Sequence, residues 1–253
     1  SIYMIGRCNQ RLGKWNDAIK TFETISPAYQ KWRLKGLAEI AVSKERLGDA
    51  KGAMDKWDEL KRELSLTRIP DIELDLLLRR ADSIFDLQRY DEAEKAYKEI
   101  ISKYPNSPDI PKVKVNLVLS LYKQNRNKEA IQEFTSMLEK YGKDDTYSLS
   151  IGDALFWKGY LTARIGSEEN EIKANLNQSI RDYKELVTRF PDNFRADDAQ
   201  FEIGFCTYSL GVYDEKKYSE AIGEYTKVLQ NYPESEYADD ALFEIGRCYR
   251  LIN

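Results

Sequence analysis

Few side chains in this sequence are of the kinds that perform covalent or metal chemistry. Three cysteines, Cys8, Cys206 and Cys248, could supply thiolates, and two adjacent acidic pairs, Asp144–Asp145 and Glu168–Glu169, could act as acid and base. The sequence contains no histidine, which removes the commonest general base, the usual partner of a nucleophilic serine or cysteine, and the commonest metal ligand. It also lacks a glycine-rich phosphate loop, a Cys-x-x-Cys pair and a calcium-binding loop. We therefore predict that the chain is not an enzyme and has no catalytic residue, no cofactor and no metal site.

The three cysteines occupy one position of a repeated pattern. Each of them follows by two residues a small residue inside a helix-length segment. Cys206 and Cys248 would therefore lie one repeat apart, roughly 10 Å for packed helices, whereas a disulfide requires Cα atoms within about 7 Å. We interpret all three as small apolar side chains buried between helices. Their number and placement do not fix a redox compartment.

The repeated pattern consists of two kinds of helix-length segment that alternate along the chain. A small residue, replaced once by valine, marks the first segment at Gly6, Ala41, Ala81, Val118, Gly159, Gly204 and Gly246. The second segment carries Ala or Ser, an aromatic residue four positions later and an aliphatic residue or Met three further on. These triplets are Ala18–Phe22–Ile25, Ala53–Trp57–Leu60, Ala93–Tyr97–Ile100, Ala130–Phe134–Met137, Ser179–Tyr183–Leu186 and Ala221–Tyr225–Val228. Such spacings share one face of a helix, and self-similarity at roughly 35–45 residues predicts a solenoid of helix pairs.

The repeat predicts an all-α chain with one solenoid over residues 1–253, made of six helix pairs and an unpaired C-terminal helix. Tyr104–Pro105, Phe190–Pro191 and Tyr232–Pro233 are expected to end second helices, because proline cannot continue a helix. Residues 165–178 and 211–218 exceed a 34-residue plan by about eight and about five residues, and we expect them to form loops on one edge. Both ends of the sequence fall inside a helix pair, so we expect a fragment of a longer chain.

The last two repeats carry a family resemblance. Ala199-x-x-x-x-Gly204, followed by Ala221-x-x-x-Tyr225 and Tyr232–Pro233, resembles the tetratricopeptide repeat. The segments from Phe190–Pro191 to Gly204 and from Tyr232–Pro233 to Gly246 resemble the bacterial form found in two envelope systems. These are the periplasmic Tol–Pal-associated proteins and the lipoprotein of the outer-membrane β-barrel assembly machine. The resemblance implies a right-handed solenoid of antiparallel helix pairs in a periplasmic or outer-membrane-associated protein, although the family's tryptophan at the fourth consensus position is absent. A cytoplasmic location also stays open.

Composition narrows the partners of the chain. The formal net charge is −4, and basic and acidic residues are interspersed without a long basic run that contains aromatic residues. We therefore expect no nucleic-acid partner. No stretch approaches the roughly eighteen apolar residues that a membrane-spanning helix needs.

By the resemblance, the first helices line a concave face, and positions three before and one after the small residue point into it. Aromatic residues and arginines occupy or adjoin these positions in the C-terminal half, where we expect a protein or peptide partner to bind. The candidate residues are Phe156, Trp157, Tyr160, Phe201, Phe205, Phe243, Arg164, Arg247 and Arg250. The alternative is that the aromatic residues pack against second helices and belong to the core.

These features predict a non-enzymatic scaffold that binds a protein or peptide partner within a bacterial cell-envelope assembly. One alternative is a structural element that stacks end to end with copies of itself through uncapped ends. Another is a module that uses the aromatic half of the concave face to bind cell-wall material or a small ligand.

Overall fold

The computed structural model describes residues 1–67 and 69–252, and this part of the chain contains thirteen α-helices, one short 3₁₀ helix and no strand. The helices are α1 (Ile2–Arg11), α2 (Trp15–Glu23), α3 (Gln30–Arg46), α4 (Ala50–Leu66), α5 (Pro70–Asp86), α6 (Tyr90–Lys103), α7 (Ile110–Lys123), α8 (Asn127–Tyr141), η1 (Asp145–Tyr147), α9 (Ser148–Thr162), α10 (Glu169–Arg189), α11 (Ala196–Leu210), α12 (Lys216–Asn231) and α13 (Ala238–Ile252). Residue contacts divide the chain into two compact units, Ser1–Gln124 (unit 1) and Asn125–Asn253 (unit 2), which are described separately.

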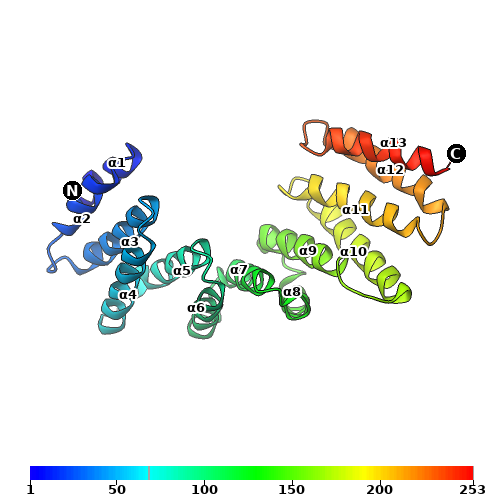
Figure 1. Ribbon diagram of the computed structural model, residues 1–253. Helices are drawn as coiled ribbons and strands as arrows, with labels where there is room; N and C mark the ends of the chain where they lie inside the picture. Colours follow the sequence, from blue (N-terminus) through cyan, green and yellow to red (C-terminus); the bar gives the residue numbers. More distant parts are fainter. Residues whose placement is uncertain (68, 253) are drawn as a thin grey trace. The chain divides into compact units, whose positions relative to one another are not determined.

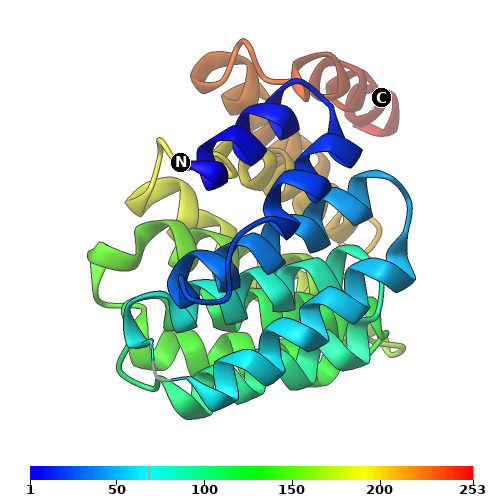
Figure 2. The ribbon, with the colours of Figure 1, turned by 90° about the vertical axis from the view of Figure 1, so that its left-hand side faces the viewer.

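Consecutive helices pack against each other within each unit. In unit 1, α1 packs on α2, α2 on α3, α3 on α4, α5 on α6 and α6 on α7, and the first helices α1, α3, α5 and α7 are also neighbours (Figure 1). Figure 2 shows α1, α2 and α3 of this unit side by side, in blue. In unit 2, each helix from α8 to α13 packs on the next. This arrangement confirms the prediction of an all-α fold built from helix pairs.

In the repeat pattern, the aromatic ring of the second helix packs directly over the small residue of the first helix. Tyr225 of α12 is fully buried, and a Cβ added at Gly204 of α11 would lie 2.6 Å from two of its ring carbons. Tyr183 of α10 covers Gly159 of α9 in the same way, with ring carbons 3.0 Å from the added Cβ. At Gly204 the ring of the second helix thus leaves no room for a Cβ unless Tyr225 moves, and at Gly159 the fit is tight, whereas other repeats hold Ala or Val at this position.

The cysteine prediction is correct for two residues and wrong for one. Cys206 is fully buried in a cluster formed by α9, α10 and α11, and Cys248 is fully buried against α12. Cys8 is exposed. The physical reason is that the second helix of the preceding repeat covers the other two thiols, whereas among the described residues no helix covers this side of α1.

The longer of the two insertions is helical, not a loop. Helix α10 begins at Glu169 and runs for 21 residues, so the extra residues add turns to its N-terminal end. Leu176 is buried there and Ile172 packs against the same cluster as Tyr183. Of the shorter insertion, residues 211–215 do connect α11 to α12 without helix, as expected, whereas residues 216–218 belong to the first turn of α12.

Candidate functional site

Four of the predicted residues form a strip along α9 and α11 of unit 2, and we name Trp157, Tyr160, Arg164 and Phe205 the aromatic–arginine strip. The Trp157 and Tyr160 rings meet edge to face with centroids 5.5 Å apart. The Arg164 guanidinium carbon lies 3.5 Å from the Tyr160 ring centroid and 5.8 Å from that of Phe205. Phe205 is 40% exposed. The strip thus offers solvent an aromatic surface with a cation at its centre, and contacts of this type contribute roughly 0.5–1 kcal/mol each at exposed sites.

The cation of the strip is held in place by α11. Arg164 donates from Nη2 to Oε1 of Glu202 at 2.8 Å and from Nη1 to Oε2 at 3.3 Å, which makes a two-pronged ion pair. It also donates to the backbone carbonyl of Tyr160 at 3.1 Å. A guanidinium fixed by a carboxylate fork loses little further freedom when a partner binds, so Arg164 forms a rigid part of the surface.

Two of the predicted aromatic residues lie deeper than the strip. Phe156 is only 6% exposed, and its ring lies 5.8 Å from that of Tyr183 between centroids. Phe201 is half-buried, with its ring 5.3 Å from Tyr225 and stacked 5.1 Å from Tyr237. These two side chains pack against the second helices and support the surface residues instead of presenting themselves to a partner.

The three predicted residues of α13 are not brought together with the strip. Arg247 lies 5.0 Å over the Tyr208 ring, donates to the Tyr208 hydroxyl at 3.0 Å and pairs with Glu244 at 2.8 Å. Phe243 is 64% exposed and Arg250 is also exposed. Among the described residues, neither of these two makes a ring contact or an ion pair with the strip. Unit 2 therefore presents one coherent aromatic surface on α9 and α11, and a separate exposed helix at α13.

Sequence reasoning missed Arg195, which covers the N-terminal end of the strip. Its guanidinium carbon lies 4.7 Å from the Phe156 ring centroid and 5.1 Å from that of Trp157. It pairs with Asp153 at 3.0 Å and Asp198 at 3.2 Å. Burial outweighs the charge of Arg195 and raises the pKa of Asp153 above its ordinary value. The sequence feature that could have indicated this role is the position of Arg195 directly before Ala196, the first residue of α11.

The same position in the next repeat holds Tyr237, directly before Ala238. Tyr237 stacks on Phe201 as Arg195 lies over Phe156. The residue before the first helix therefore covers the aromatic side chain of the preceding repeat in both cases. This equivalence shows that a loop position, and not only the helical faces, determines which aromatic residues stay on the surface.

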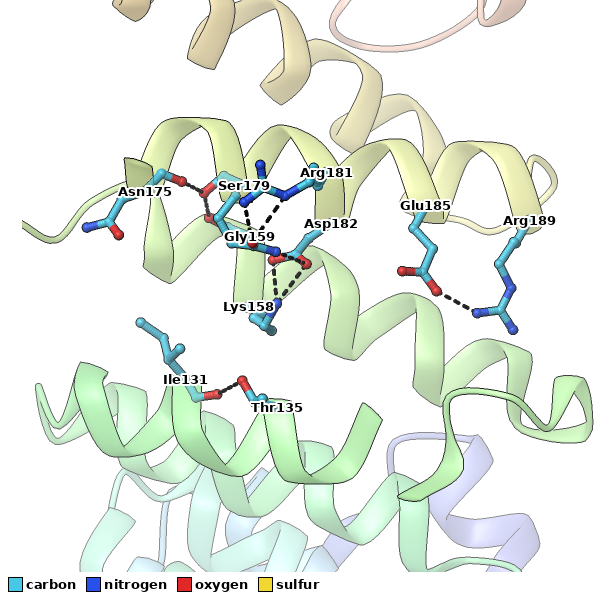
Figure 3. Close-up of polar contacts among 11 residues, drawn as sticks. Ile131, Thr135, Lys158, Gly159, Asn175, Ser179, Arg181, Asp182, Glu185 and Arg189 are labelled. Carbon is cyan, nitrogen blue, oxygen red and sulfur yellow. Dashed lines mark hydrogen bonds and ion pairs between the residues drawn. The ribbon is translucent and has the colours of Figure 1, made fainter. Parts of the chain in front are cut away.

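A buried ion pair holds α9 on α10 beside the strip (Figure 3). Lys158 donates to both carboxylate oxygens of Asp182 at 2.7 Å, and the two side chains are 12% and 7% exposed. Ser179 donates to the backbone carbonyl of Gly159 at 2.8 Å. Burial raises the pKa of Asp182 above its ordinary value, against the opposing effect of Lys158. These contacts fix the helix that carries Trp157 and Tyr160.

Three of the four residues in the acidic pairs that could have acted in catalysis have structural partners. Asp144 accepts from the backbone and the hydroxyl of Thr146 at the start of η1, and Asp145 pairs with Arg189 at 2.7 Å. Glu169 pairs with Lys173 in the first turn of α10. The described residues contain no group of three or more potential metal ligands, and none of their helices meets the length and hydropathy needed to cross a membrane.

Comparisons with known proteins agree with this architecture. The sequence model for the outer membrane lipoprotein YfiO matches residues 75–214, and a tetratricopeptide repeat model matches residues 1–26 and 198–235. A search of curated protein sequences found no match. These matches are consistent with the predicted tetratricopeptide resemblance and with its bacterial envelope form.

Two solved structures show a similar fold. The structure of MamA from Desulfovibrio magneticus RS-1, residue 41 to the end, is 15% identical with a TM-score of 0.54, and the match covers 80% of this chain and 97% of MamA. BtubC (BKLC) from P. vanneervenii is 12% identical with a TM-score of 0.59 over 92% of this chain and 91% of BtubC. They confirm the predicted right-handed solenoid of tetratricopeptide type. The YfiO model matches more than half of the residues of this chain. The chain therefore belongs to the YfiO outer membrane lipoprotein family.

Proposed function

We propose that this chain binds a protein or peptide partner on the aromatic–arginine strip, as a non-enzymatic scaffold in a bacterial cell-envelope assembly. Tetratricopeptide repeats and the YfiO family are associated with protein–protein interaction, which supports the scaffold role. The single observation that carries the site is that Arg164 lies rigidly between the Tyr160 and Phe205 rings while Phe205 stays 40% exposed. Aromatic residues and arginine are the side chains that most often anchor interfaces.

Membership of an outer membrane lipoprotein family supports a periplasmic or outer-membrane-associated location for this scaffold. The proposed partner is therefore another envelope protein. Affinity would come from burial of Trp157, Tyr160 and Phe205, with no bond made or broken.

Photocrosslinking in cells of the source organism tests this proposal. A photoreactive benzoyl-phenylalanine replaces Phe205 in one variant and Val212, which is 73% exposed in the α11–α12 loop, in the control. We expect irradiation to give a discrete adduct with an envelope protein from position 205 and none from position 212. Adducts of equal yield at both positions, or none at position 205, would refute the strip as the binding site.

The single variant Phe205→Ala separates an effect on binding from an effect on folding better than a double variant in which Phe201 is also replaced by alanine. Phe205 is partly exposed, so its removal should leave the thermal unfolding midpoint nearly unchanged. Phe201 packs on Tyr225 and Tyr237, so its removal should lower that midpoint. The proposal requires that Phe205→Ala no longer binds the crosslinked partner while its thermal unfolding midpoint stays unchanged.

The exposed face of α13 supports self-association as a second candidate function. Leu242, Phe243 and Tyr249 are 56%, 64% and 54% exposed, whereas Gln200 and Thr207, which correspond to Leu242 and Tyr249 in α11, are buried. Sedimentation velocity over a concentration series tests this candidate. Growing assemblies that Leu242→Lys abolishes would support it, and a single monomer peak at every concentration would exclude it.

A further inference from the structure

A large aromatic side chain outside the predicted site is exposed in the turn between α10 and α11. Phe194 is 61% exposed. Phe190, four residues earlier, packs against the buried cluster of α9, α10 and α11, so the turn already has an apolar contact with the core. Single exposed apolar residues are common on protein surfaces, so exposure alone gives Phe194 no function. The equivalent turn of the next repeat and the contacts of the ring show what this side chain does.

The turn between α12 and α13 shows that the fold does not require an aromatic residue at this position. The two turns form the same hydrogen bonds. The side chains of Asn193 and Ser235 each accept from the backbone N–H two residues later, at 2.9 and 3.2 Å, and their own backbone N–H groups each donate to the carbonyl three residues earlier, at 2.9 and 3.0 Å. Phe194 therefore corresponds to Glu236, which is exposed. Because a glutamate serves in the same turn, the geometry of the turn does not explain the phenylalanine.

Arg195 joins Phe194 to the aromatic–arginine strip. Its guanidinium carbon lies 5.1 Å from the Phe194 ring centroid and also 5.1 Å from that of Trp157. Asp153 and Asp198 pair with this guanidinium at 3.0 and 3.2 Å and hold it against both rings. The rings of Phe194 and Trp157 therefore lie against one fixed cation, and the aromatic surface continues from α9 onto the turn.

The turn that carries Phe194 is packed tightly on α9. A Cβ added at Gly152 of α9, which is buried, would lie 2.3 Å from the side-chain nitrogen of Asn193. Gly152 and Trp157 belong to the same helix, so this contact fixes the turn relative to the strip. A surface that is already positioned in the free protein loses less conformational entropy when a partner binds.

We propose that the protein bound by the strip also contacts Phe194, so that the binding surface of unit 2 extends beyond the first helices to the turn before α11. This inference rests on the proposed function, because the strip and Phe194 meet the same partner. The partner presents an uncharged apolar side chain to Phe194, since the charge of Arg195 is already compensated by two carboxylates. Aromatic side chains that become buried in this way are frequent anchors of interfaces.

Photocrosslinking of the full chain in cells of the source organism tests this inference. A photoreactive benzoyl-phenylalanine replaces Phe194 in one variant and Glu236, at the equivalent position of the next turn, in the matched control. We expect position 194 to give an adduct with the same protein as position 205, identified by mass spectrometry, and position 236 to give about tenfold less of it. In a Phe205→Ala background the adduct from position 194 should fall several-fold, because both positions contact one partner.

Side-chain variants separate an effect on binding from an effect on folding. Phe194→Glu introduces the residue type that the next repeat carries at this exposed position, so the thermal unfolding midpoint should stay nearly unchanged. The yield of the adduct from position 205 should nevertheless fall several-fold in this variant. Glu236→Ala is the matched control and should leave that yield unchanged.

The outcomes distinguish failure of this inference from failure of the proposed function. An adduct from position 205 without the same adduct from position 194 would overturn the inference and leave the proposed function standing. Equal yields from positions 194 and 236, an adduct from position 194 that persists in Phe205→Ala, or an unchanged yield in Phe194→Glu would also overturn the inference alone. Absence of an adduct from position 205 would overturn the proposed function and this inference with it.

Discussion

Alanine at two equivalent glycines provides a sharp test of how the repeat is packed. Gly204 of α11 and Gly246 of α13 occupy the same position of successive repeats, each within a first helix. A Cβ at Gly204 would lie 2.6 Å from two ring carbons and 2.9 Å from a third ring carbon of Tyr225. A Cβ at Gly246 would meet no atom within 4 Å. The same substitution is therefore made once under a ring and once in open space.

The expected free-energy changes follow from two opposing contributions. Replacing glycine by alanine inside a helix stabilises by about 1 kcal/mol at either position. At Gly204 the added methyl must displace Tyr225, which is fully buried, and overpacking of this kind costs about 1–3 kcal/mol. We therefore expect Gly246→Ala to raise the free energy of unfolding by up to about 1 kcal/mol and Gly204→Ala to lower it by up to about 2 kcal/mol.

Urea unfolding followed by circular dichroism at 222 nm measures both changes, and amide hydrogen exchange assigns them to α11 or α13. A double-mutant cycle adds the decisive comparison. In a Tyr225→Ala background the ring is gone, so Gly204→Ala should become stabilising as it is at Gly246. Equal effects of the two alanine substitutions in the wild-type background would refute the assignment of Gly204 as the point of closest approach.

Three further predictions address the charges and thiols. A chromogenic disulfide reagent should modify one thiol rapidly in the native protein, Cys8, because the other two are buried; all three should react in denaturant. Burial acts to raise the pKa of Glu39, but Arg79 and Arg7 hold it below its ordinary 4.5 in the folded protein, so its stabilisation is complete above that pH and is lost as the pH falls through the folded value. Glu39→Gln should therefore flatten the acid side of a plot of urea midpoint against pH. Lys158→Met should cost about 3–5 kcal/mol by leaving Asp182 buried without its cation, and adding Asp182→Leu should restore much of that loss.

The helix pairs could be predicted from the sequence because their determinants recur at fixed spacings. Gly204 and Tyr225, for example, belong to a pattern that is repeated along the chain, so several weak signals support the same register. The helical extension of α10 could also have been predicted from the sequence. Ile172 and Leu176 continue the spacing that leads to Tyr183, which marks a helical face and not a loop.

The depth of each aromatic side chain could not be predicted in the same way. Phe201 and Phe205 are one helical turn apart, yet the first packs under Tyr237 and the second stays exposed. The difference depends on Tyr237, which lies in the turn before the first helix of the following repeat, and such a turn position has no helical period. Arg195 covers Phe156 in the same way, and the residue type alone did not predict this contact.

The arginines show why the two units present different surfaces although they share one repeat. In unit 1, a single buried carboxylate, that of Glu39, pairs with two arginines, and the neighbouring groove between α3 and α5 is lined by both carboxylates and arginines. In unit 2, three arginines near the first-helix face each lie on an aromatic ring and also have their own carboxylate. These sets are Tyr160–Arg164–Glu202, Phe156–Arg195–Asp153 and Tyr208–Arg247–Glu244. Charge is therefore balanced locally in unit 2, and what remains for a partner is aromatic surface. Because salt screens exposed charges over about 8–10 Å but does not weaken apolar burial, a partner bound through this aromatic surface should stay bound as the salt concentration rises.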